Sequence, residues 1–276
     1  MAKSSDDNTP IEGARFEDSR DYVQSMARGL AVLSAFDREH YRLTLGEIAS
    51  RAALSRAAAR RLVMTLQHLG YVRDFGRHYM LGPRVLELGF GYLGSMNLTD
   101  LAQPLMEDLA RQVNQSSSMA VLDGQSIVYV LRVPGQRVMS VTLGVGARLP
   151  AFCAAMGRVL LSGLAAPELD TWLDTCRPAP LTPHTVTEPH RLRRIVAEVG
   201  RQGYAYVEQE LELGLCSIAV PVRNGDGRIA TAINVSMPYH PDAARHALKN
   251  ILAPLQQTAA AIESSLPATR LAPVSA

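Results

Sequence analysis

The strongest constraint on the fold is a run of local signals near the N-terminus that predicts three short helices followed by a hairpin. Apolar residues recur at helical spacing after Ser25, a residue type that favours the N-cap, and predict a first helix over Ser25–Phe36. Thr44 and Glu47 have the spacing of a capping box, in which each residue satisfies a backbone amide of the other. A second helix should therefore run from this box to about Arg51.

A third helix is predicted over Arg56–Leu69, with Ser55 as its N-cap and Gly70 at its end. Two short strands follow, and Gly76 supplies the turn between them. Three helices and a hairpin occur in generic small α+β domains, but arginines at the start of the third helix and in the hairpin loop favour a winged helix-turn-helix. The residues expected to face inward from the third helix are Ala59, Leu62, Val63, Leu66 and Leu69.

Charge is distributed unevenly along the chain, although the formal net charge is only +2. Residues 22–84 contain ten arginines and four acidic residues, a net charge of +6, whereas residues 1–21 carry −3 and residues 85–276 carry −1. A compact basic segment in an otherwise neutral chain indicates a polyanionic partner. A solvated basic surface is the alternative for each arginine taken alone.

The start of the third helix carries the residue types that read DNA bases. A recognition helix lays its first residues against base edges, where arginine pairs with guanine and an alanine methyl contacts the thymine methyl. We therefore predict that Arg56 and Arg60 read bases and that Arg61 touches phosphate or packs. The hairpin should grip phosphate or the minor groove, which fixes register rather than sequence. The predicted DNA-contacting residues are Ser55, Arg56, Ala57, Ala58, Arg60, Arg61, Arg73, Arg77 and His78.

The rest of the chain alternates strands and helices and predicts an α+β domain. Asp123 and Gly124 mark one hairpin turn, and Asn224–Gly227 mark another. A further strand is expected over Val138–Leu143. The expected helices of this domain are residues 101–113, capped by Thr99 or Asp100, then 154–162, 168–174, 189–200 and 242–264.

Segments of both halves, in this order and spacing, resemble the IclR family of bacterial regulators. The resemblance covers about Tyr22 to Ser264. Its segments are SMARGLAVL (25–33), LGEIA (45–49), LQHLGYV (66–72), YMLGPRVLELG (79–89), MGRVLL (156–161), GYAYVEQE (203–210) and GLCSIAVPV (214–222). The stretch RLPAFCAAMGRVL (148–160) resembles the subgroup that controls protocatechuate and para-hydroxybenzoate catabolism through the β-ketoadipate pathway.

The resemblance implies a GAF-like α+β effector-binding domain, with a pocket between a curved sheet and the helix that holds Met156 and Gly157. Asn234 and Ser236 lie two apart on a strand, so they share a face and can donate hydrogen bonds to a carboxylate. Arg148 could pair with an aromatic acid or form a structural salt bridge instead. The implied effector-contacting residues are Arg148, Met156, Gly157, Glu208, Cys216, Ser217, Asn234 and Ser236.

The implied partners are a double-stranded DNA operator and a small organic acid. Protocatechuate, para-hydroxybenzoate, muconate and β-ketoadipate all remain open as effectors, and the resemblance does not separate an activator from a repressor. One small DNA-binding module makes few base contacts, so a homodimer or tetramer on a palindromic site is expected. The expected segments are a disordered tail over 1–21, a winged helix-turn-helix DNA-binding domain over 22–82, a linker helix over 83–98, an effector-binding domain over 99–266 and a disordered tail over 267–276.

Two other classes of function compete with a regulator. An enzyme could use Cys153 or Cys216 as nucleophile with His184 or His190 as base, but neither cysteine lies in a recognisable catalytic motif. A purely architectural DNA-binding protein would leave the large neutral domain unexplained. We expect no cofactor and no metal ion, since no phosphate loop, dinucleotide motif or ligand cluster is present. With no signal-peptide pattern or membrane-spanning run, a cytoplasmic protein without membrane association is expected.

Overall fold

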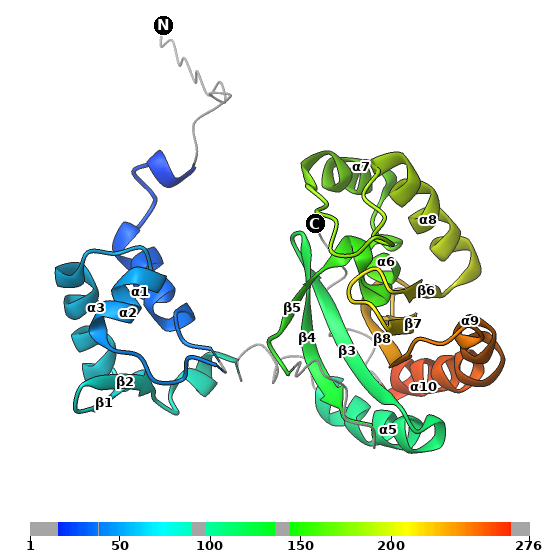
Figure 1. Ribbon diagram of the computed structural model, residues 1–276, viewed down its shortest axis with the longest axis horizontal. Helices are drawn as coiled ribbons and strands as arrows, with labels where there is room; N and C mark the ends of the chain where they lie inside the picture. The colour runs from blue at the N-terminus through cyan, green and yellow to red at the C-terminus, as the bar shows by residue number, and fades with distance from the viewer. Residues whose placement is uncertain (1–15, 38, 90–97, 136–143, 266–276) are drawn as a thin grey trace, which may run out of the picture. The chain divides into compact units, whose positions relative to one another are not determined.

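The computed structural model describes residues 16–37, 39–89, 98–135 and 144–265, which form two compact units, Met1–Gly91 and Tyr92–Ala276 (Figure 1). The expected strand over Val138–Leu143, the C-terminal tail and most of the N-terminal tail lie outside the described residues. Among the described residues, no helix combines the length and apolar character needed to cross a bilayer.

The first unit is a three-helix fold with a two-stranded antiparallel hairpin, as the local signals predict (Figure 1). Val32, Ile48, Val63 and Val72 lie at the centre of its core and are almost completely buried. Its elements are η1 (Phe16–Asp18), α1 (Gln24–Ser34), α2 (Leu45–Arg51), α3 (Arg56–His68), β1 (Val72–Phe75) and β2 (His78–Leu81).

The capping residues predicted for α2 and α3 act as expected. Thr44 Oγ1 accepts a hydrogen bond from the Glu47 amide, and the Glu47 carboxylate accepts one from the Thr44 amide at 2.7 Å. Ser55 Oγ accepts from the Ala58 amide at 3.3 Å and so starts α3. Gly70 and Gly76 end α3 and turn the hairpin with φ angles of +83° and +74°, a region that glycine enters without steric cost.

Two predicted details of this unit are wrong. Ser25 does not cap the first helix, because α1 begins one residue earlier and Val23 occupies the N-cap without a side-chain hydrogen bond. Leu69 does not belong to the inward stripe: it is the C-cap residue of α3, where the chain leaves the helical path, and it is 43% exposed. Of the expected linker helix, residues 85–89 are helical, and the rest falls on residues that are not described.

The second unit is built on a six-stranded antiparallel sheet with the order β5-β4-β3-β8-β7-β6. In Figure 1, helices cover both faces of this sheet, with α6 to α8 on one side and α5 and α10 on the other. The strands are β3 (Ser116–Asp123), β4 (Ser126–Val133), β5 (Arg148–Pro150), β6 (Ala205–Glu208), β7 (Leu215–Arg223) and β8 (Ile229–Pro238). The helices that cover it are α5 (Leu98–Val113), α6 (Ala155–Leu161), α7 (Ala166–Thr175), α8 (Pro189–Gln202) and α10 (Leu252–Ser265).

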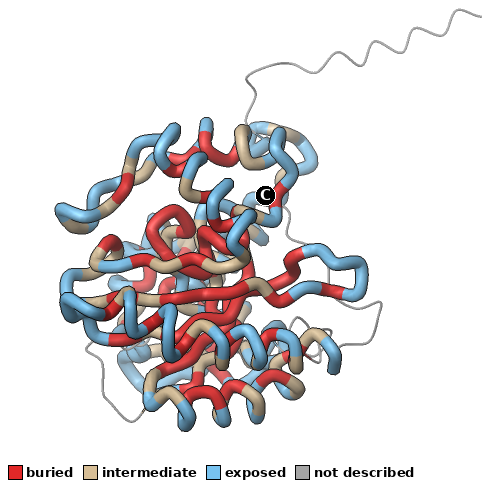
Figure 2. Tube along the Cα trace, turned by 90° about the vertical axis from the view of Figure 1, so that its right-hand side faces the viewer, coloured by how far each residue is buried: buried red, intermediate tan, exposed pale blue. Residues whose placement is uncertain are grey.

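Each face of the sheet has its own hydrophobic core. One core joins Met119, Ile218 and Ile233 to α5 and α10, and the other joins Tyr129 and Ala219 to α6, α7 and α8. Figure 2 shows the result as long buried stretches along the central strands, with exposed residues at the turns. Because all its strand pairs are antiparallel and helices pack against it, this unit has the α+β fold expected from the sequence.

The closing helix is interrupted, contrary to the prediction of one helix from Asp242 to Ser264. It consists of α9 (Ala243–His246), a π-helical segment η3 (Ala247–Ile251) and α10. Pro254 lies near the start of α10; because proline lacks an N–H and its ring crowds the carbonyl four residues earlier, the Asn250 carbonyl within the π-helical segment receives no hydrogen bond from it. The predicted caps Thr99 and Asp100 are also wrong, since α5 already includes Leu98.

Candidate nucleic-acid interface and ligand cavity

The exposed face of α3 presents a group of arginines at its N-terminal end. Ala59 and Val63 are fully buried and anchor the helix, which turns Arg56, Arg60 and Arg61 to solvent. Arg56 and Arg60 are one helical turn apart and therefore lie on the same face. Of the predicted set, Ser55 and Ala57 are also exposed and Ala58 is half-buried.

None of these arginines forms an ion pair with a described residue, which distinguishes them from structural arginines of the same unit. Arg51 pairs with Asp37 at 2.5 Å and donates to the Ala35 carbonyl, and Arg84 donates to the Leu69 carbonyl at 2.8 Å. The guanidinium groups of α3 are thus available to an external anion. Bidentate pairing with guanine or phosphate is what such groups do best.

The hairpin adds a second basic element. Arg73, Arg77 and His78 are all exposed, and Gly76 lets the loop turn tightly between them. Arg42 stacks over the Phe75 ring at 5.8 Å and over Tyr41 at 5.6 Å, so a further cation lies at the tip of the wing. The sequence prediction did not include Arg42, because its contact with the hairpin is tertiary.

A cavity opens in the second unit between the sheet and the segment that leads into α6. The space it encloses, together with the open solvent at its mouth, amounts to about 580 Å³. Much of the wall is apolar, with Tyr129, Leu149, Met156, Val207 and Leu211 among the lining residues. Arg132 and Glu210 are the charged residues among those described in the wall.

A β-bulge in β4 places Arg132 in this wall. Ala120 of β3 pairs with Tyr129, but the next residue, Met119, pairs with Leu131, so Val130 is an extra residue in β4. Because side chains alternate between faces, the extra residue turns Arg132 to the same face as Tyr129. Without the bulge, Arg132 would face the core under α5 and α10.

A polar row crosses the sheet beside Arg132. Arg132 pairs in register with Ser118 of β3, and Ser118 pairs with Asn234 of β8, so the three side chains share one face. Arg132 Nη1 lies 3.5 Å from Ser118 Oγ. Asn234 Nδ2 donates to Ser217 Oγ at 2.9 Å and to Ser236 Oγ at 3.0 Å. No described carboxylate forms an ion pair with Arg132.

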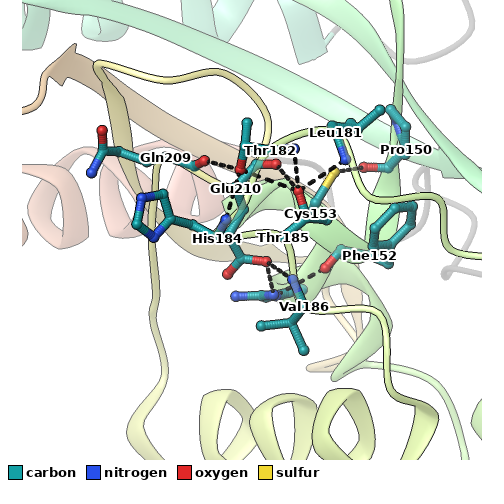
Figure 3. A network of polar contacts seen from close by, with 11 residues as sticks. Pro150, Phe152, Cys153, Leu181, Thr182, His184, Thr185, Val186, Gln209 and Glu210 are labelled. Carbon is teal, nitrogen blue, oxygen red and sulfur yellow. Dashed lines mark hydrogen bonds and ion pairs between the residues drawn. The ribbon is translucent and has the colours of Figure 1, made fainter.

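The other charged residue of the wall is neutralised inside the protein. Glu210 accepts a hydrogen bond from Arg158 Nη2 at 2.7 Å, and the Val186 amide donates to the same oxygen at 3.0 Å. Both side chains of this ion pair are buried. Figure 3 shows that the hydroxyls of Thr182 and Thr185 also bond to the segment of Glu210, by donating to the carbonyls of Gln209 and Glu210. Among the charged residues described in the wall, Arg132 therefore keeps a positive charge that can bind an anion.

The structure brings together five of the eight residues predicted to contact an effector. They all line the cavity, although the side chain of Cys216 packs into the core on the opposite face of the sheet. Sequence reasoning did not predict Arg132, Tyr129, Gln209 and Glu210 as lining residues. Of these, Glu210 could have been found, because it is the second acidic residue of the segment 203–210 that pointed to Glu208. The five predicted residues are Met156, Cys216, Ser217, Asn234 and Ser236.

The other three predicted residues do not line this cavity. Arg148 forms a salt bridge with Asp123 at 2.5 Å on the surface, the structural alternative considered for it. Glu208 lies on the opposite face of the sheet and accepts a hydrogen bond from the Tyr206 hydroxyl at 3.0 Å. Gly157 packs against the backbone, since a Cβ there would lie 2.1 Å from the Ala151 carbonyl oxygen.

The cysteines lack the environment of catalytic nucleophiles. Burial, with a smaller contribution from Glu210, raises the pKa of the Cys153 thiol to about 12, and burial also raises the pKa of Cys216. A thiolate is the reactive form, so a raised pKa suppresses reactivity near neutral pH. His184 and His190 are exposed and hydrogen-bond to neither thiol. Within the described residues, no group of acidic, histidine and cysteine side chains could hold a metal ion.

Comparison with known families decides between the remaining classes. Residues 25–74 match the family described as "IclR helix-turn-helix domain", and residues 90–264 match "Bacterial transcriptional regulator IclR C-terminal". The chain belongs to the IclR family. It is therefore a bacterial DNA-binding transcription regulator with an N-terminal helix-turn-helix and a C-terminal effector-binding domain.

Similar proteins include regulators of aromatic catabolism. The Pca regulon regulatory protein of Pseudomonas putida is 41% identical over 222 residues, which cover 80% of this chain and 76% of the relative. The p-hydroxybenzoate hydroxylase transcriptional activator of Acinetobacter baylyi is 35% identical, over 87% of this chain and 91% of the relative. A solved IclR homolog from Microbacterium hydrocarbonoxydans, complexed with 4-hydroxybenzoate, has a TM-score of 0.77 and 27% identity, covering 87% of this chain and 98% of that one.

Proposed function

We propose that this IclR-family regulator senses a small aromatic acid and controls catabolic genes of the β-ketoadipate pathway type. The observation that carries the proposal is the guanidinium of Arg132, which forms no ion pair with a described carboxylate, in a cavity whose wall is largely apolar and includes the Tyr129 ring. An organic acid with an apolar body satisfies both features, since its carboxylate pairs with the arginine and its body fills the remaining space. The names of the similar regulators of aromatic catabolism support the same class of ligand.

The proposal assigns DNA reading to the first turns of α3. Arg56 and Arg60 would pair with base edges, while Arg73, Arg77 and His78 would fix the hairpin on the phosphate backbone. Two modules of one oligomer would read a palindromic operator. Exposed apolar residues of α1, namely Met26 at 66% and Leu30 at 50%, together with Leu86 at 63%, would form the seam of the dimer. We assign no catalytic step to the buried cysteines.

A ligand screen on the full-length protein tests the proposed function. A ligand that binds only the folded state raises its melting temperature, by an amount that grows with concentration over Kd. The screen compares benzoate, 4-hydroxybenzoate, protocatechuate, muconate and β-ketoadipate, and each stabilising acid is then tested for its effect on operator binding. Stabilisation by an aromatic acid that also changes operator affinity is the expected result. If no aromatic acid stabilises the protein, the proposed effector class is wrong.

Replacing Arg56 by alanine is expected to weaken operator binding and relax sequence preference without changing effector affinity. A bidentate arginine–guanine pair contributes about 1–3 kcal/mol of discrimination, which corresponds to roughly 5- to 150-fold. Titration of labelled operator and of a scrambled duplex, at two salt concentrations, measures both effects. The matched control is Arg191→Ala, which removes an exposed arginine from α8 in the other unit. Equal losses in the two variants would mean that Arg56 contributes only net charge.

A further inference from the structure

One atom of the cavity wall has a hydrogen-bonding capacity that the described residues do not use. Asn234 is 4% exposed and lines the cavity, yet its Oδ1 is buried and accepts no hydrogen bond from them. Buried polar atoms in folded proteins are almost always paired, so each exception needs an explanation. An acceptor left over in a ligand cavity indicates a donor that comes with the ligand.

In the structure, the nitrogen of the Asn234 amide is the branch that bonds to the neighbouring side chains. Ser217 and Ser236 pair in register across β7 and β8, so their hydroxyls lie side by side. Both hydroxyls accept from Asn234 Nδ2, at 2.9 Å and 3.0 Å. The amide nitrogen is thereby engaged twice, and the planar carboxamide leaves its oxygen as the free group. This arrangement offers the ligand an acceptor rather than a donor.

Asn234 lies two strands away from Arg132, with Ser118 of β3 between them. Arg132, Ser118 and Asn234 follow one another across β4, β3 and β8 on the same face, and adjacent strands are about 4.8 Å apart. A carboxylate held by Arg132 therefore leaves the other end of a small ring near Asn234. A ring hydroxyl is a group of that size that donates a hydrogen bond.

We propose that Asn234 is a specificity-determining residue, whose Oδ1 accepts a hydrogen bond from a ring hydroxyl of the effector while Arg132 binds its carboxylate. This inference rests on the proposed function and narrows its ligand to hydroxylated aromatic acids. Aromatic acids without a hydroxyl leave the acceptor unpaired. An open-chain dicarboxylic acid places a second carboxylate there, which is acceptor-only when ionised and carries no hydrogen to share.

The difference in affinity between aromatic acids with and without a hydroxyl should be large enough to measure directly. A site built to hydrogen-bond a ligand hydroxyl rejects the analogue that lacks it by far more than a hydrophobic pocket rejects one methylene, because the polar group of the protein is left unpaired. We expect the wild-type protein to bind at least one of 3-hydroxybenzoate and 4-hydroxybenzoate at least about 10-fold more tightly than benzoate. The corresponding methoxybenzoate, whose ether oxygen can accept but not donate a hydrogen bond, should bind more weakly than the hydroxybenzoate by the same factor.

Calorimetric titration of the full-length protein with benzoate, the two hydroxybenzoates, their methoxy counterparts and adipate tests the inference. Asn234→Ala should remove the preference, so that benzoate and the preferred hydroxybenzoate bind within about 3-fold of each other. The control is Thr231→Val, a buried polar-to-apolar change on the same strand whose hydroxyl bonds to Ala120 on the other face. It should keep the wild-type preference.

Each outcome separates this inference from the proposed function. If benzoate or a methoxybenzoate binds the wild-type protein as tightly as both hydroxybenzoates, Asn234 does not select a hydroxyl, although an aromatic acid is still the effector. The same conclusion follows if Asn234→Ala binds with an unchanged preference. If none of the aromatic acids binds, the proposed function itself is wrong. The wild-type series decides the question even if the Asn234 variant fails to fold.

Discussion

Replacing Arg132 by methionine is expected to lower the affinity for the aromatic acid by about 30-fold or more. Truncating one partner of a buried, hydrogen-bonded charge pair costs about 2–5 kcal/mol, and each 1.4 kcal/mol is a factor of ten in Kd. The loss is large because the carboxylate would have to leave water without a cation to receive it. Arg132 is the cation that the bulge in β4 turns into the wall, and no described carboxylate competes for it.

Calorimetry on the variant measures the affinity, and operator binding without effector shows that the rest of the protein is intact. The affinity of Arg132→Lys for the acid should lie between those of the wild type and Arg132→Met, because an ammonium keeps the charge but lacks the planar bidentate geometry of a guanidinium. The matched control is Arg148→Met; the sequence offered this arginine either as an effector contact or as part of a salt bridge, and it pairs with Asp123 outside the cavity wall. Loss of affinity in the Arg148 variant with normal binding in the Arg132 variant would reverse the assignment.

The two arginines show why the cavity was harder to predict than the helix-turn-helix. The capping box of Thr44 and Glu47 and the cap at Ser55 act within three residues, so the sequence alone predicts where α2 and α3 begin. The face on which Arg132 lies depends instead on one extra residue in β4, and strict alternation from Tyr129 places it on the wrong side. No local signal in the sequence marks that residue.

The polar wall was predictable only in part for a similar reason. Asn234 and Ser236 share a face by strand alternation, which the sequence shows. Their neighbours across the sheet come from other segments of the chain, because Asn234 pairs with Ser118 of β3 and Ser236 pairs with Ser217 of β7. Glu208 was assigned to the cavity, but alternation along β6 turns it to the opposite face from Val207. Glu210 lies two residues further on, beyond the end of β6 and after Gln209 with its φ of +56°, so it reaches the cavity wall because the strand has ended and not through alternation.

Breaking the buried pair of Arg158 and Glu210 is expected to destabilise the effector-binding unit by about 3–5 kcal/mol, because the remaining charge is left buried without its partner. The two side chains are only 3% and 9% exposed, and Arg158 also donates to the Phe152 carbonyl at 3.0 Å. For a unit of this size each kcal/mol lowers the melting temperature by about 2–4 °C, so Arg158→Met should melt roughly 6–20 °C lower.

The double variant Arg158→Met with Glu210→Leu distinguishes two effects on stability. One is the destabilisation caused by a buried charge without a partner, and the other is the contribution of the intact ion pair. Replacing both members of a buried pair by apolar residues is often neutral or stabilising, so most of the lost stability should return. Ligand affinity need not return with it, because Glu210 also binds the Val186 amide and so fixes the loop that lines the cavity beside Gln209. A stable double variant with weakened acid binding would mean that this pair serves the geometry of the cavity more than the stability of the fold. Recovery of neither property would show that the surrounding segment depends on the ion pair itself, and recovery of both would leave the pair without a role in ligand binding.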